Sequence, residues 1–188
     1  MPRGRTKTEN ALKVVPDRCE NTPVALRRGS PGEQAFGAFG DLPLELSSFV
    51  GRARELEEVG RLLSGSRLLT LTGAGGSGKT RLALEAAGHL AREFEDGACL
   101  VELAPLSDPD LVAGALASSL GVRDQPDLSP SEAIVRYLYL REMLLVLDNC
   151  EYPVDACARL AEELLRACPN LRVMATSRET LRIAEESA

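Results

Sequence analysis

Eight consecutive residues have the composition and spacing of a phosphate-binding loop. They match the pattern G-x-x-x-x-G-K-[ST] without a mismatch, and they lie between an apolar segment typical of a strand and an Ala/Leu-rich segment typical of a helix. Glycines let the backbone curl so that successive N–H groups point at a phosphate, and the helix start adds the positive end of its dipole. The sequence therefore predicts a nucleotide phosphate site formed by Gly73, Ala74, Gly75, Gly76, Ser77, Gly78, Lys79 and Thr80.

Lys79 and Thr80 are the two side chains of this loop with a predicted chemical role. In such a loop the lysine reaches the β- and γ-phosphates, and the threonine hydroxyl binds Mg²⁺. Lys79 is also unusual in composition, because it is the only lysine after residue 13 in a chain with nineteen arginines. A compact ammonium is not interchangeable with a guanidinium in a tight phosphate site, so we expect Lys79 to be required for nucleotide binding.

An acid at the end of a later apolar segment is the second candidate. The segment 144–147 is continuously apolar and is followed by Asp148, and after a phosphate-binding loop such a carboxylate positions Mg²⁺ through water. Many ATPases place the base that orients the attacking water next in sequence. Here that position is Asn149, which cannot accept a proton. Glu151 is the nearest acid that could act as this base, and an ordinary loop carboxylate is the alternative for it.

A third candidate is Arg178, which follows Thr176 and Ser177 at the end of another apolar segment. In open α/β sheets, ligands bind beyond the carboxyl ends of the strands. An arginine at this position can contact the γ-phosphate of a bound nucleotide and so distinguish ATP from ADP. Without the other motifs, Arg178 would be interpreted as a surface residue.

The elements that must position these residues alternate along the chain. Short apolar segments predict strands, and segments with helical spacing of apolar residues predict helices between them. Such an alternation is typical of a parallel sheet covered on both faces. The predicted strands are Arg67–Thr72, Ala98–Leu103, Met143–Asp148 and Leu171–Ala175, and the predicted helices are Arg52–Leu63, Lys79–Phe94, Asp108 to near Gly121, Ser129 to about Leu140 and Val154–Cys168.

Composition divides the chain into two parts. Residues 1–40 contain seven basic and four acidic residues, are rich in small polar residues, Gly and Pro, and lack sustained periodicity, which predicts a disordered tail. Residues 41–188 are then one nucleotide-binding domain. The net charge of −6 argues against direct DNA binding, and without a secretory signal or a membrane-spanning segment we expect a cytoplasmic protein.

The cysteines have none of the spacings of a structural zinc site or a disulfide framework. There are five, an odd number, and no two are spaced as C-x-x-C. Cys157 and Cys168 share one face of a predicted helix with Leu160 and Leu164. We expect the cysteines to be free thiols that pack as small apolar residues.

Taken together and in this order, the motifs resemble those of NB-ARC/STAND-type P-loop ATPases, in particular the modules of LuxR-like and SARP-like bacterial transcriptional regulators. The resemblance covers about residues 42–183. It rests on LPLELSSFVGRARELEEV (42–59), LTLTGAGGSGKTRLALE (69–85), VELAPLSDPDLV (101–112), LLVLDNCE (144–151) and LRVMATSRETLRI (171–183).

The resemblance implies roles for further residues. A motif of the family that lies against the nucleotide near the adenine corresponds to Val50, Gly51, Arg52 and Glu55, and the arginine that senses the γ-phosphate corresponds to Arg178. It implies a three-layer α/β sandwich with strand order 5-1-4-3-2, in which the fifth strand would lie beyond residue 188. The chain is then interpreted as a fragment, and the free edge of its first strand is expected to promote self-association.

In this family, exchange of ADP for ATP acts as a switch. The resemblance therefore implies an ATP/ADP-binding module that uses Mg²⁺ and hydrolyses ATP slowly or not at all, as the asparagine at position 149 also suggests. A small-molecule or nucleotide kinase is the alternative from another class, because such kinases also use a phosphate-binding loop. Residues 121–143 contain no arginine-rich lid of the kind that such kinases carry.

Overall fold

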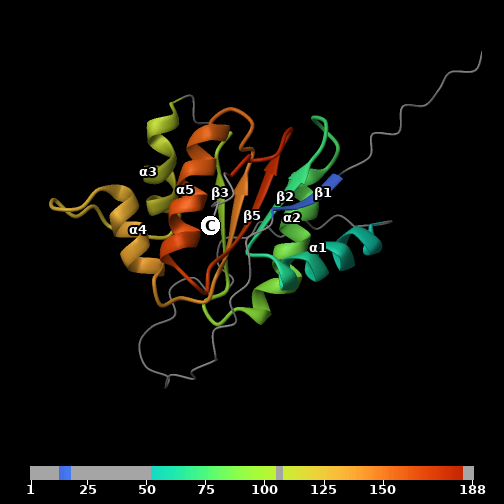
Figure 1. Ribbon diagram of the computed structural model, residues 1–188, viewed down its shortest axis with the longest axis horizontal. Helices are drawn as coiled ribbons and strands as arrows, with labels where there is room; N and C mark the ends of the chain where they lie inside the picture. The colour runs from blue at the N-terminus through green and yellow to red at the C-terminus, as the bar shows by residue number, and fades with distance from the viewer. Residues whose placement is uncertain (1–12, 18–51, 105–107, 184–188) are drawn as a thin grey trace, which may run out of the picture.

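The computed structural model of the chain describes residues 13–17, 52–104 and 108–183. Within these ranges the predicted alternation of strands and helices is present, and helices cover both faces of a central sheet (Figure 1). None of the helices described there is both long and apolar enough to cross a membrane. Val50, Gly51 and most of the predicted tail lie outside the described residues.

Four apolar segments form the parallel part of the sheet. They are β2 (Leu68–Thr72), β3 (Ala98–Glu102), β4 (Leu144–Asp148) and β5 (Arg172–Ser177). Their spatial order is β2-β5-β4-β3, which confirms the predicted order 1-4-3-2 for these strands. Every residue of β2 and β4 is buried, as expected for strands covered on both faces.

Helices pack on the two faces of the sheet as separate layers, visible on opposite sides in Figure 1. One layer contains α1 and α2, and the other contains α3, α4 and α5. The helical elements in chain order are α1 (Ala53–Gly65), α2 (Lys79–Leu90), η1 (Ala91–Glu93), η2 (Pro109–Leu111), α3 (Val112–Ser119), α4 (Pro130–Leu138) and α5 (Val154–Ala167).

Strand β4 packs against the helices on both faces of the sheet. Leu144 and Val146 belong to the apolar cluster formed with α1 and α2, whereas Leu145 and Leu147 belong to the cluster formed with α3, α4 and α5. Successive side chains of a strand point to opposite faces, so a continuously apolar strand buries residues in both clusters. The fold is a three-layer α/β sandwich, as predicted from the sequence.

The helix boundaries follow local signals in the sequence. Helix α4 begins after Ser129, whose hydroxyl accepts a hydrogen bond from the N–H of Glu132, while the Glu132 carboxylate accepts one from the N–H of Ser129 at 2.8 Å. The Ser129 hydroxyl also donates a hydrogen bond of 2.7 Å to the Glu132 carboxylate, and this bond, together with that from the Ser129 N–H, lowers the pKa of Glu132. The helix predicted over 79–94 is divided, because α2 ends at Leu90 and the 3₁₀ turn η1 follows it.

A fifth strand corrects two expectations about the N-terminal segment. Strand β1 (Lys13–Asp17) pairs antiparallel with β2, with Lys13 opposite Thr72, so this part of residues 1–40 has regular structure. It also occupies the edge of β2 that was expected to be free. Two consecutive valines suit a strand, and Pro16 is tolerated because it lies in an edge strand. The rest of residues 1–40 lies outside the described residues.

Removal of β1 should restore the edge-strand behaviour that was expected of β2. We predict that a chain lacking residues 1–17 self-associates, because the N–H and C=O groups along one side of a buried apolar strand lose their partners. Light scattering at increasing protein concentration measures this effect, with the full chain as the control. Identical monomeric behaviour of both chains would contradict the prediction.

The described cysteines are free thiols, as predicted. Cys150, Cys157 and Cys168 are buried, and Cys99 is half-buried. A hydrogen bond with Cys157 and burial together raise the pKa of the Cys150 thiol well above its ordinary value. A thiol of high pKa is a poor nucleophile, so Cys150 is interpreted as a packing residue.

Candidate functional site

The predicted phosphate-binding loop connects β2 to α2 at the carboxyl end of the parallel strands. Gly76 and Gly78 have φ angles of 73° and 83°, in the left-handed region that glycine adopts without strain. Gly78 is also the residue from which α2 begins. The glycines of the motif therefore provide the backbone turns that the loop requires before the helix.

Gly78 combines a positive φ with a close neighbouring side chain. A Cβ atom at this position would lie 3.4 Å from Nη1 of Arg52, which is a tight contact. The positive φ of 83° is a second constraint, because residues with a side chain rarely adopt it. We predict that Gly78→Ala lowers the free energy of unfolding by about 1 kcal/mol or more. The matched control is Gly88→Ala in the exposed part of α2, where nothing lies within 4 Å of the new Cβ.

This control should change stability in the opposite direction, by about 0.5–1 kcal/mol, because alanine favours a helix over glycine. Thermal or denaturant unfolding of the two variants measures the difference. Equal effects of the two substitutions would contradict the role assigned to Gly78.

Lys79 begins α2, and its side chain turns back across the loop. Its ammonium donates hydrogen bonds to the carbonyl oxygens of Gly73 at 3.0 Å and Ala74 at 3.2 Å. The residue is only 6% exposed, which is unusual for a lysine. The ammonium is therefore held inside the curve of the loop, where the predicted phosphates would lie.

Asp148 is the centre of a hydrogen-bond network at the end of β4. Its Oδ1 accepts hydrogen bonds from the hydroxyls of Thr80 at 2.8 Å and Thr176 at 2.6 Å. Its Oδ2 accepts one from the side-chain amide of Asn149 at 3.0 Å. The structure thus brings together Thr80 and Asp148, the two residues predicted to bind Mg²⁺, from α2 and β4. Hydroxyl and carboxylate oxygens are ligands that Mg²⁺ prefers.

Thr176 is a member of this network to which the sequence assigned no role. Its hydroxyl donates to Asp148 and accepts a hydrogen bond from the backbone N–H of Asn149 at 3.0 Å. It thereby fixes the turn after β4, in which Asn149 has a φ of 62°. Its place at the carboxyl end of β5, next to β4, was the available signal, because parallel strands end at the same edge of the sheet.

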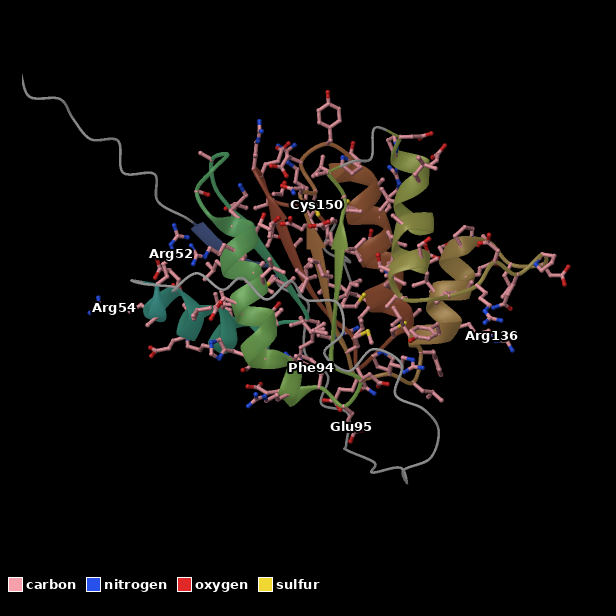
Figure 2. All side chains as sticks on the ribbon, turned by 180° about the vertical axis from the view of Figure 1, so that it is seen from behind. Arg52, Arg54, Phe94, Glu95, Arg136 and Cys150 are labelled. Carbon is pink, nitrogen blue, oxygen red and sulfur yellow. The ribbon has the colours of Figure 1, made fainter. Side chains whose placement is uncertain are left out.

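Arg52 reaches the loop from the residue just before α1 (Figure 2). Its Nη2 donates a hydrogen bond of 2.7 Å to the carbonyl oxygen of Ser77. The guanidinium lies beside Gly78, because a Cβ added to this glycine would lie 3.4, 3.5 and 3.6 Å from its Nη1, Nη2 and Cζ atoms. Of the upstream motif, Arg52 is thus at the loop, while Val50 and Gly51 lie outside the described residues.

Arg178 forms an ion pair with Glu151 and approaches the loop. Nε of Arg178 lies 3.4 Å from Oε1 of Glu151, and Nη2 of Arg178 is 3.8 Å from the position of a Cβ on Gly75. The side chain of Arg178 is 69% exposed and that of Glu151 is 21% exposed. Arg178 is therefore at the loop, and Glu151 is its ion-pair partner.

Several buried side-chain nitrogen and oxygen atoms at this site have no hydrogen-bond partner among the described residues. Among the described residues there are four such side-chain atoms. Three of them are Oγ of Ser77 in the loop, Nη1 of Arg52, which contacts the loop, and Oε2 of Glu151, the ion-pair partner of Arg178. A buried polar group that makes no hydrogen bond is costly, so each such group needs an explanation. Two of the three can donate to an anion, which fits a bound phosphate group. The residues present therefore suit a Mg²⁺-bound nucleotide.

The sheet order, the loop between β2 and α2, and the acid at the end of β4 define the P-loop NTPase fold. The fold is similar to that of Cdc6p from Pyrobaculum aerophilum, with a TM-score of 0.52 and 20% identity, over 77% of this chain and 42% of that one. This likeness concerns the fold alone. No family model matches the chain.

The chain is similar in sequence to segments of proteins that are named as regulators. The chain is 50% identical to a Mycobacterium tuberculosis protein named "Putative HTH-type transcriptional regulator", over 125 residues that make up 66% of this chain. It is 31% identical over 150 residues to the regulatory protein AfsR of Streptomyces griseus, over 73% of this chain. The chain spans 14% and 15% of the lengths of these two relatives.

Proposed function

We propose that the chain is an ATP/ADP-binding switch module of a signal-transducing regulator, with slow or no hydrolysis of ATP. The proposal rests on the arrangement of Lys79, Thr80 and Asp148 at one end of the sheet. The ammonium of Lys79 lies inside the loop, and the hydroxyl of Thr80 donates a hydrogen bond to the carboxylate of Asp148. The similarity of the chain to segments of transcriptional regulators supports the regulatory role.

Each of these residues has a distinct part in the proposed binding. The backbone N–H groups of the loop and the ammonium of Lys79 bind the phosphates, and the hydroxyl of Thr80 and the carboxylate of Asp148 hold Mg²⁺. Arg52 supports the loop through the carbonyl oxygen of Ser77. Bound Mg²⁺ neutralises charge on the phosphate oxygens.

Slow hydrolysis is proposed because the residue after Asp148 is not a base. The side-chain amide of Asn149 donates a hydrogen bond to Asp148 and has no proton-accepting nitrogen. Glu151, the next acid in the sequence after Asp148, is paired with Arg178. A module that retains its nucleotide for long periods suits a switch. We propose that the chain is of the NB-ARC/STAND type, because its motifs between residues 42 and 183 resemble those of that family.

Equilibrium titration with a fluorescent ATP analogue, and competition by ADP, tests the proposal. We expect one saturable site for each nucleotide and phosphate release far below the roughly 10 s⁻¹ typical of enzymes. Phosphate release is measured with and without small-molecule and nucleotide acceptors, because a strong acceleration by one of them would indicate a kinase instead. Absence of saturable binding by the folded chain would refute the proposal.

A further inference from the structure

Resting on the proposed function, we infer that Glu151 is a positioning residue that limits the preference of the chain for ATP over ADP. It does so by holding Arg178, the side chain that the sequence predicts to contact the third phosphate of ATP. ATP must draw this guanidinium away from a carboxylate, whereas ADP leaves the ion pair in place. The guanidinium of Arg178 thus exchanges the carboxylate of Glu151 for the third phosphate when ATP binds.

The positions of the two residues support a competition of this kind. Glu151 lies in the turn between β4 and α5, and Arg178 follows the last residue of β5. The guanidinium contacts Glu151 through Nε, while its Nη2 extends toward Gly75 in the phosphate-binding loop. Arg178 therefore bridges the carboxylate and the loop, and a small movement of its side chain changes its partner.

The two side chains differ in how freely they can move. Arg178 is 69% exposed, so its long side chain can change rotamer into solvent, whereas Glu151 is only 21% exposed. In addition, Oε2 of Glu151 is buried and accepts no hydrogen bond from any residue that the structure describes. An adjacent cation stabilises such a carboxylate, and among the described residues Arg178 is the cation paired with Glu151. Glu151 therefore stays in place and retains Arg178.

The consequence is a difference in affinity between two ligands that otherwise share the site. Removal of the negative charge by Glu151→Gln releases Arg178, so binding of the non-hydrolysable ATP analogue AMP-PNP should strengthen about two- to five-fold, the range expected for a partly exposed ion pair. The affinity for ADP should not change. Arg178→Ala should remove the preference for AMP-PNP, and Glu151→Gln should then have no additional effect.

The experiment is an equilibrium titration of the full chain with AMP-PNP and with ADP, both with Mg²⁺. The variants are Glu151→Gln, Arg178→Ala and the double variant, each checked by thermal unfolding. The matched control is Glu179→Gln, which removes a neighbouring charge that pairs with Arg182 at 3.1 Å. The control should leave the ratio of the two affinities as in the wild type.

The outcomes separate this inference from the proposed function. Failure of the wild-type chain to bind either nucleotide would refute the proposed function itself. Binding of both nucleotides with an unchanged affinity ratio in Glu151→Gln would overturn the inference alone. An equal gain in the Arg178→Ala background, or an equal gain for ADP, would also overturn it, because the effect would then not act through Arg178 and the third phosphate.

Discussion

Replacement of Lys79 by alanine is expected to lower the affinity for ATP and ADP by about ten- to hundred-fold or more, because a hydrogen bond to a charged group contributes roughly 1.5–3 kcal/mol. The ammonium is held within the loop by the carbonyl oxygens of Gly73 and Ala74. No other lysine follows residue 13, so no second ammonium can replace it from that part of the chain. Titration with a fluorescent ATP analogue measures the loss.

The control for Lys79→Ala is Arg92→Ala. Arg92 is an exposed residue of η1, beyond the far end of α2, and its removal changes the net charge by the same amount. We expect wild-type affinity for this variant. Unchanged affinity of a folded Lys79→Ala chain would be incompatible with phosphate binding at the loop.

Asp148→Asn is expected to remove most of the dependence of nucleotide affinity on Mg²⁺. The substitution keeps the shape of the side chain and an oxygen that can accept from Thr80 and Thr176, but it removes the charge that attracts the cation. With Mg²⁺ present, we expect the affinity to fall about ten-fold, corresponding to roughly 1.4 kcal/mol. Titrations with Mg²⁺ and with a chelator measure the dependence directly.

Asp155→Asn is the matched control for this prediction. Asp155 lies exposed in the first turn of α5, and its replacement removes the same charge without touching the network around Asp148. Its Mg²⁺ dependence should equal that of the wild type. A wild-type response to Mg²⁺ in the Asp148→Asn chain would contradict the role proposed for the carboxylate.

Much of the fold was predictable because the strong signals are local in sequence. Continuous apolar runs such as 144–147 identified the parallel strands, and the pattern from Gly73 to Thr80 located the turn between β2 and α2. Strand β1 was missed, since five residues in a segment rich in polar residues, Gly and Pro show too short a pattern to indicate a strand. Its existence depends on pairing with β2, a partner more than fifty residues away.

The members of the candidate site were predictable, but their contacts were not. Sequence indicated Glu151 and Arg178 separately, one as a base and one as a sensor of the γ-phosphate. Their ion pair depends on the adjacency of β4 and β5, whose ends bring the two side chains together. Thr176 was overlooked for the same reason, because its hydrogen bond to Asp148 crosses from one strand to the other.

The residue type of Asn149 predicts only part of its role. The sequence shows that it cannot act as a base, but not that its amide donates to Asp148 or that its backbone is in the left-handed region. Asparagine tolerates that conformation better than most residues. Its presence is thus explained by the turn and by the support of Asp148, as well as by the absence of a base.

The central claim is that a nucleotide binds at the loop between β2 and α2. An amide ¹H–¹⁵N NMR titration of the 20.2 kDa chain with Mg²⁺-ADP tests it most directly. The account predicts saturable shift changes that are largest for residues 73–80 and negligible in α4, on the opposite side of the sheet from α2. Changes centred elsewhere, or no changes at millimolar ADP, would contradict it.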